Sequence, residues 1–188
     1  EALELLEAHR DRLFVCPAVA WEITFLEHYQ SFGFETGSRE HEGYAAELEA
    51  TQVSVKRMKE VGVRLLVGGD YGLNITPHGT YARELEYFTE YFGFSPGEAL
   101  QAATKHGGEA FMPDGRLGTL EAGKIADMVI VTGNPLEDIT LLQDASNIRA
   151  VVKDGEIYSG LRDDDSPYRK TSGQLDHLLK ESLCAADQ

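Results

Sequence analysis

Apolar and polar positions in the first 108 residues alternate between short apolar runs and longer stretches with helical spacing. The apolar runs, residues 12–19 and 63–68, have the length of strands and end close to proline or glycine. Helical spacing predicts helices over residues 1–10, 42–61, 81–92 and 96–106. The resulting order of helix, strand, helix, strand, helix, helix predicts two βα units of a parallel α/β fold.

Local signals mark the connections between these elements. Residues 95–98, Ser-Pro-Gly-Glu, form a capping box with proline at the first helical position. The pair Gly107 and Gly108 predicts the end of that helix. Residues 21–38 carry five aromatic side chains and predict a long connection, a kind of segment that is usually functional.

From Leu117 onward the pattern changes to short β-rich runs separated by turn residues. Asp154 and Gly155 form a strong hairpin signal between two of these runs. The pattern therefore predicts a unit of α/β structure over residues 1–112 and a small β-module over 113–160. A polar tail over 161–188 follows, with a possible short helix.

The net charge of −15 disfavours nucleic acid and anionic membranes as partners, because both require clustered Lys and Arg. No apolar run approaches the roughly 18 residues that a membrane helix needs. The two cysteines form no CxxC pair, which favours a cytoplasmic location. The chain starts at Glu1 within a helical pattern, so we expect its true start to lie upstream.

Asp70 is the best candidate for chemistry, because it follows an apolar run and two glycines at the end of the predicted strand. A parallel barrel strand presents catalytic residues in this way at its C-terminal rim. The alternative is a turn or capping aspartate, the common role of Asp beside Gly. His78 is the second candidate, in a loop that also holds Tyr71 and Asn74, and its alternative is an ordinary loop histidine.

The remaining histidines and acidic residues are weaker candidates. No H-x-H or H-x-x-x-H pair occurs in the chain. His9 and His106 fit surface positions on or beside helices, whereas His28 and His41 could line a pocket. Glu84, like Glu86, lies on an amphipathic helix, where exposure to solvent is expected.

A second and more specific signature covers residues 117–139, followed by the hairpin at 151–158. Together with Gly68-Gly69-Asp70, it resembles the C-terminal part of a metal-dependent amidohydrolase, of the imidazolonepropionase-like and Xaa-Pro dipeptidase-like branch. The residues that match the closing signature are Gly118, Leu120, Glu121, Gly123, Lys124, Ala126, Asp127, Asn134, Pro135, Leu136 and Asp138. The resemblance implies an α/β fold made of the last two βα units of a TIM (β/α)8 barrel and the C-terminal half of a small β-sandwich.

The resemblance also implies roles for individual residues. Asp70 would bind a divalent metal, with one or two zinc ions as the first expectation, and would accept the proton of the attacking water. His78, Tyr71 and Trp21 would contact the substrate, a small amide or dipeptide-like molecule. Lys124 would be a turn lysine rather than a metal ligand.

Most of the metal site that such an enzyme needs is absent from this sequence. A catalytic zinc requires about three protein ligands, and Asp70 supplies one. We therefore expect an upstream barrel segment or a second chain to complete the enzyme, and a homo-oligomer as its assembled form. Two hypotheses remain: a portion of a hydrolase that cleaves carbon–nitrogen bonds, or a non-catalytic barrel fragment that serves binding or assembly.

Overall fold

The structure, a computed structural model, describes residues 1–160 of the 188. The predicted tail and its short helix lie outside these residues. The α-helices are α1 (Ala2–Ala8), α2 (Ala20–His28), α3 (Arg39–Glu60), α4 (Arg83–Phe92), α5 (Pro96–Gln101) and α6 (Gly107–Phe111). The strands are β1 (Phe14–Val15), β2 (Arg64–Leu65), β3 (Met128–Val131), β4 (Ile148–Lys153) and β5 (Glu156–Gly160). Short 3₁₀ segments cover Tyr29–Phe32, Ile139–Gln143 and Ala145–Asn147.

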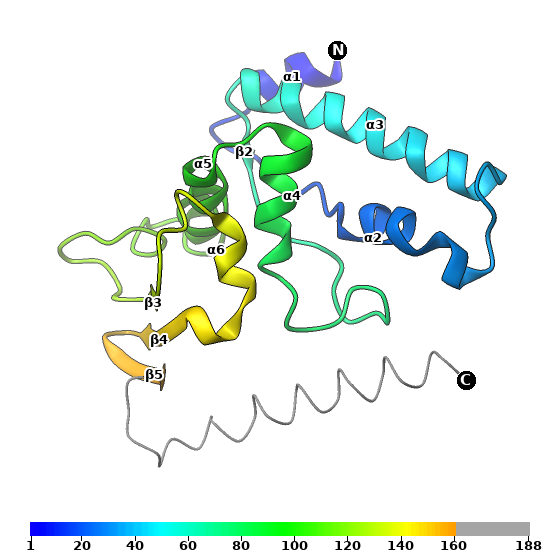
Figure 1. Ribbon diagram of the computed structural model, residues 1–188. Helices are drawn as coiled ribbons and strands as arrows, with labels where there is room; N and C mark the ends of the chain where they lie inside the picture. Colours follow the sequence, from blue (N-terminus) through cyan, green and yellow to red (C-terminus); the bar gives the residue numbers. More distant parts are fainter. Residues whose placement is uncertain (161–188) are drawn as a thin grey trace.

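Strands β1 and β2 form the parallel pair that the sequence predicts. Phe14 pairs with Arg64 and Val15 with Leu65. Helices α2 and α3 connect the two strands and pack on each other, with α3 as the long helix at the top of Figure 1. The regular strands are shorter than the predicted runs, but the prediction of parallel α/β structure in this part of the chain is confirmed.

The core lies where α4, α2, α3 and β2 meet. Its largest fully buried side chains are Phe88, Phe92, Ile23, Leu65, Glu84, Val19 and Val55. The predicted exposure of Glu84 is wrong, since its exposed fraction is 0%. Glu84, Phe88 and Phe92 follow one another at four-residue spacing, so they share the face of α4 that packs inward.

The prediction of a long connection over residues 21–38 is also wrong. This segment contains α2 and a 3₁₀ turn, and Phe25 packs against Phe32, Phe34 and Tyr44 with ring centroids 5.6, 5.5 and 4.2 Å away. Aromatic residues are only moderate helix formers, and burial decides the conformation here. These rings therefore pack against one another and do not form a row of exposed substrate-binding side chains.

The predicted capping box is present: the Ser95 side chain accepts from the Glu98 N–H, and the Glu98 carboxylate accepts from the Ser95 N–H. The predicted helix end at Gly107 is wrong. After α5 the backbone passes through a π-helical turn, Ala102–His106, and continues into α6. A β-carbon at Gly108 would stand 2.6 Å from the Gly118 Cα, so close packing explains this glycine better than helix termination does.

The π-helical turn also positions His106, whose predicted place on a helix surface is wrong. The His106 side chain is part-buried, and its Nδ1–H donates to the Leu65 carbonyl of β2 at 2.9 Å. The ring therefore joins the helical layer to the parallel strand pair.

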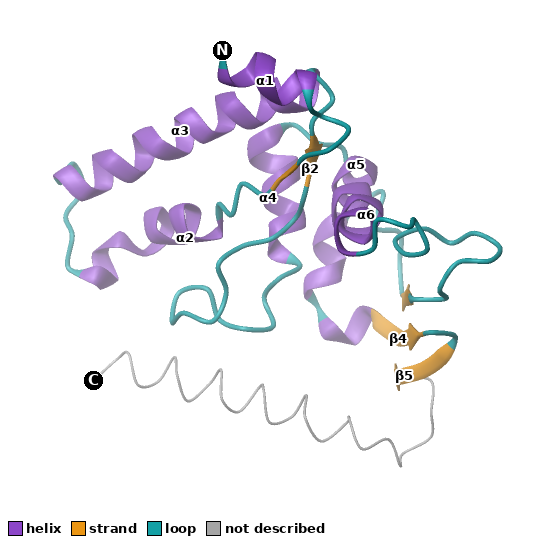
Figure 2. Ribbon diagram, turned by 180° about the vertical axis from the view of Figure 1, so that it is seen from behind, coloured by secondary structure: helices purple, strands orange, loops and turns teal. Residues whose placement is uncertain are grey.

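The chain ends its described part in an antiparallel sheet of order β3-β4-β5. Asp154 and Gly155 form the predicted turn, with φ values of 51° and 80°. Figure 2 shows β4 and β5 at the opposite end of the molecule from α3. No helix within residues 1–160 is long and apolar enough to cross a membrane.

Candidate functional site

Asp70 lies shortly after β2, and its side chain is exposed. Its backbone carbonyl accepts a hydrogen bond from the Thr76 hydroxyl at 2.6 Å, and Thr76 is only 2% exposed. The Gly72 N–H donates to the Thr76 carbonyl at 2.8 Å, which closes the turn. Figure 2 shows this segment within the long teal loop between β2 and α4. Thr76 thus anchors the loop that carries Asp70, a role that the sequence pattern did not indicate.

His78 and Tyr71 lie in the same loop and are linked by Tyr81. His78 Nδ1 and the Tyr81 hydroxyl share a hydrogen bond of 2.7 Å. The Tyr71 and Tyr81 rings meet edge to face, with centroids 4.8 Å apart. His78 also packs closely on Gly72, where a β-carbon would stand 3.0 Å from His78 Nε2. The sequence pattern assigned Tyr81 only to the predicted helix over residues 81–92, and no motif indicated its contact with His78.

Trp21 is separate from this group. Its indole N–H donates to the Tyr44 hydroxyl at 3.2 Å, between α2 and α3. Among the residues that the structure describes, Trp21 shares no hydrogen bond or ring contact with Tyr71 or His78. Asn74 is exposed at the tip of the loop. The structure thus brings Tyr71 and His78 together with Tyr81, and leaves Trp21 in a neighbouring aromatic cluster.

A buried carboxyl group lies behind the Asp70 turn. Burial raises the pKa of Glu84 to about 7, and the Ala20 N–H and the Tyr71 hydroxyl oppose that rise. Neither group lies in a position that meets the usual distance and angle limits of a hydrogen bond to Glu84, so both Glu84 oxygens are without a hydrogen-bond partner. Burial also raises the pKa of Tyr71, and that of Tyr87 to about 12. The two tyrosines are therefore neutral near neutral pH, whereas Glu84 titrates in that range.

The donor atoms present do not form a complete metal site. Within residues 1–160, no group of three or more His, Cys, Asp or Glu side chains is placed to hold a metal ion. Cys16 lies near the turn, and its Sγ–H donates to the Gly68 carbonyl at 3.1 Å. Burial raises the pKa of the Cys16 thiol, which disfavours the thiolate that binds metals. Asp70 alone would supply one donor, fewer than the three that a catalytic zinc needs.

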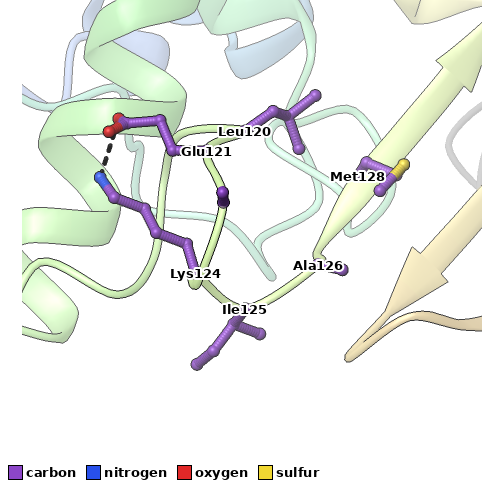
Figure 3. A pocket seen from close by; sticks show the side chains of 7 residues that line it. Leu120, Glu121, Lys124, Ile125, Ala126 and Met128 are labelled. Carbon is purple, nitrogen blue, oxygen red and sulfur yellow. Dashed lines mark hydrogen bonds and ion pairs between the residues drawn. The ribbon is translucent and has the colours of Figure 1, made fainter.

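A hollow of about 270 Å³ lies elsewhere, in the segment before β3. Figure 3 shows its lining, which includes Leu120, Glu121, Lys124 and Met128. Lys124 Nζ donates to the Glu121 carboxylate at 3.0 Å and to the Thr119 hydroxyl, so it holds this turn together. None of the candidate site residues lines the hollow.

Comparison with curated proteins finds relatives for part of the chain. Ochratoxinase from Aspergillus niger is 34% identical over 114 residues, which are 60% of this chain and 22% of that protein. Imidazolonepropionase from Symbiobacterium thermophilum is 29% identical over 110 residues, 58% of this chain and 26% of that protein. The aligned residues therefore span about a quarter of the length of these relatives.

Solved structures extend the similarity to most of the chain. The crystal structure of A. niger ochratoxinase superposes with a TM-score of 0.72 at 24% identity, and the match covers 88% of this chain and 37% of that one. A putative prolidase from Bifidobacterium longum gives a TM-score of 0.68 at 27% identity, with 87% and 39% covered. These neighbours indicate an α/β fold related to the TIM barrel.

The match to a protein family includes both the loop with Asp70 and the sheet at the end of the described residues. The amidohydrolase family matches residues 2–158, nearly the whole described part. The resemblance stated from the sequence is thereby confirmed, and the chain belongs to the amidohydrolase family.

Proposed function

We propose that this chain is the C-terminal portion of a metal-dependent hydrolase that cleaves carbon–nitrogen bonds. The observation that carries the proposal is the exposed Asp70 on an anchored turn shortly after a strand of a parallel pair. The C-terminal ends of parallel strands are where barrel enzymes of this type hold their reactive groups. Membership of the amidohydrolase family supports this chemistry.

In this proposal β1 and β2 are the last two strands of a (β/α)8 barrel, and the sheet β3-β4-β5 is the C-terminal half of a β-sandwich. An upstream segment or a second chain supplies the remaining strands and metal donors. The short length of this chain relative to its relatives supports that assignment. The division at residues 112 and 160, the homo-oligomer and the cytoplasmic location stay predictions.

Asp70 would contribute one carboxylate to the metal site and accept a proton from the water that attacks the substrate. When bound, a divalent ion, with one or two zinc ions as the expected case, acidifies that water and polarises the carbonyl. His78, held by Tyr81 and packed on Gly72, would contact the substrate together with Tyr71. Trp21 would act at most from the neighbouring aromatic cluster.

The substrate class that fits these residues is a small amide with an apolar or aromatic group next to the scissile bond. Tyr71, His78 and Tyr81 offer aromatic surface, and Tyr81 is 50% exposed. The names of the relatives, ochratoxinase, imidazolonepropionase and prolidase, agree with such small amide or cyclic amide substrates.

Replacing Asp70 with Asn in the full-length protein tests the catalytic proposal. Turnover of N-acyl amino acid and dipeptide substrates should fall by about 10²–10⁴-fold, because an amide cannot accept the proton. Asp114→Asn, an exposed aspartate paired with Arg116, is the matched control and should keep full activity. Metal content is measured for both variants.

Wild-type turnover in Asp70→Asn would contradict the role proposed for Asp70. Absence of turnover in the wild-type protein itself would instead favour the second candidate, a non-catalytic module for binding or assembly. The observation in its favour is that, within residues 1–160, no group of three or more His, Cys, Asp or Glu side chains is placed to hold a metal ion. Co-purification of a segment with an H-x-H motif would support the hydrolase, because such a segment brings the missing donors.

A further inference from the structure

Glu84 is the one buried acidic side chain of the described core, and no hydrogen-bond donor pairs with its carboxyl group. Its exposed fraction is 0%, and neither carboxylate oxygen has a hydrogen-bond partner of regular geometry. Burying a carboxyl group in this way costs stability compared with an apolar side chain of the same size. Features of this kind cluster at functional sites, where geometry matters more than stability.

The carboxyl group lies directly against the turn that carries Asp70. A β-carbon at Gly69 would stand 2.5 Å from Glu84 Oε1, 2.6 Å from Tyr71 Cε2 and 3.0 Å from Ala20 Cβ. The carboxyl therefore fills the space beside the residue that immediately precedes Asp70. Only glycine leaves room for it, and the Tyr71 ring closes the same space from the other side.

The same carboxyl group also reaches the segment after β1. Ala20 is the first residue of α2, and its backbone N–H faces Glu84. The Tyr71 hydroxyl faces it from the loop after β2, and this hydroxyl is likewise unpartnered. Glu84 on α4 thus meets the chain just beyond the C-terminal ends of both parallel strands.

We propose that Glu84 is a positioning residue that holds the Gly69–Tyr71 turn against the start of α2 and thereby fixes the direction in which Asp70 projects. The proposal rests on the proposed function, because it assigns Asp70 to the reaction. Glu84 itself does not touch the substrate. A carboxyl group suits this role better than an apolar side chain, because the Ala20 N–H and the Tyr71 hydroxyl both face it and its two oxygens can accept from both.

The test compares Glu84→Leu, Glu84→Gln and the control Glu90→Leu in the full-length protein. Leucine fills the volume but accepts no hydrogen bond, so kcat should fall by about 10–100-fold, since a small misplacement of a reacting group has effects of this size. KM should stay within about twofold, and Tm should equal or exceed that of the wild type, because the buried carboxyl is gone. Glutamine keeps an acceptor oxygen and should retain kcat within about threefold. Glu90 is an exposed residue of the same helix, and its replacement should change neither kcat nor Tm.

A residue with only a structural role would lower kcat and Tm together, and that result would overturn the proposal. Unchanged kcat in Glu84→Leu would overturn it as well. If Glu84→Leu does not fold, the Glu84→Gln comparison decides: retained activity supports the positioning role, and a loss as large as that of Asp70→Asn contradicts it.

A second measurement separates this proposal from the proposed function, because it needs no activity. Gly69→Ala should lower the Tm of the wild-type protein and lower it less in the Glu84→Ala background, where the clash with Glu84 Oε1 is removed and those with Tyr71 and Ala20 remain. If this coupling is present but Asp70→Asn keeps full turnover, the proposed function fails and the contact stands. If the coupling is absent, the positioning role fails whatever Asp70 does.

Discussion

The two parts of the molecule differ in how they bury their apolar side chains. The helical region, residues 1–112, has its own core around Phe88 and Phe92. The sheet region, residues 113–160, has two buried apolar side chains, of which Ile139 belongs to the helical core and Ala150 lies in β4. Its large apolar side chains Leu120, Val129, Ile130, Leu136 and Tyr158 are 40–70% exposed.

This difference shows that the segment with the more specific family signature need not be the segment that folds around its own core. Residues 117–139 carry the more specific family pattern, yet they lie in the region with little core of its own. Such a sheet gains stability when another layer covers its apolar face. The helical region carries the weaker aspartate motif and is the part that packs on itself.

The largest expected effect is that of Phe88→Ala, which removes a fully buried ring from the helical core. The free energy of unfolding should fall by about 3–5 kcal/mol, from lost burial and the cavity that remains. Hydrogen exchange of β3, β4 and β5 amides reports whether the sheet region responds. Because it lacks a core of its own, we expect its protection to fall together with that of α4. Unchanged protection of the sheet would show that the two regions are independent.

The next effect is a pH dependence within the helical region. The pKa of Glu84 is raised from 4.5 to about 7 in the folded protein, so the folded state holds a proton that the unfolded chain releases. The free energy of unfolding should therefore fall as pH rises from about 4.5 to 7, by on the order of 3 kcal/mol. Urea titrations across this range measure it, and Glu84→Gln should flatten the slope. An equal slope in that variant would assign the effect to other groups, such as Glu22, whose pKa is also raised by burial.

A smaller effect is expected for His78→Ala, which tests the loop rather than the core. Loss of the ring should raise KM by about tenfold, roughly the value of one well-placed contact, and should leave the metal content unchanged. Tyr81→Phe is the control that keeps the ring contact with Tyr71 but removes the hydrogen bond to His78. Loss of metal from His78→Ala would make His78 a ligand, and unchanged kinetics would make the loop a simple cover.

The smallest effect is expected for Val129→Ser on β3, a side chain that is 56% exposed in the described structure. With the sheet uncovered, the free energy of unfolding should change by no more than about 0.5 kcal/mol. A clearly larger loss in the full-length protein, measured by urea unfolding, would show that another segment covers this face.

Sequence reasoning succeeded where local chemistry decides the structure. The capping box at Ser95, the turn at Asp154 and the parallel pairing of β1 with β2 all depend on short motifs or on simple alternation of elements. It failed where packing between distant segments decides. The helix α2 depends on the contacts of Phe25, Gly108 is required by its neighbour Gly118, and Glu84 is buried because it shares a face with Phe88.

The candidate site was predictable in part for the same reason. Asp70, Tyr71 and His78 follow one another on one loop, so a single motif indicates all three. The residues that hold this loop, Thr76, Tyr81 and Glu84, act through hydrogen bonds, ring contacts and close packing that no spacing rule reveals.

The π-helical turn at Ala102–His106 sets how the residues after it are oriented relative to α5. A turn of this type contains about one residue more than an α-helical turn. If the same residues formed a regular α-helix, everything beyond the turn would be rotated by about 100° relative to α5. The His106 ring would then leave the Leu65 carbonyl, and Gly108 would lose its register against Gly118. A residue inserted into or deleted from the regular turn of α5 should therefore disrupt these contacts more than a change in the exposed turns of this protein.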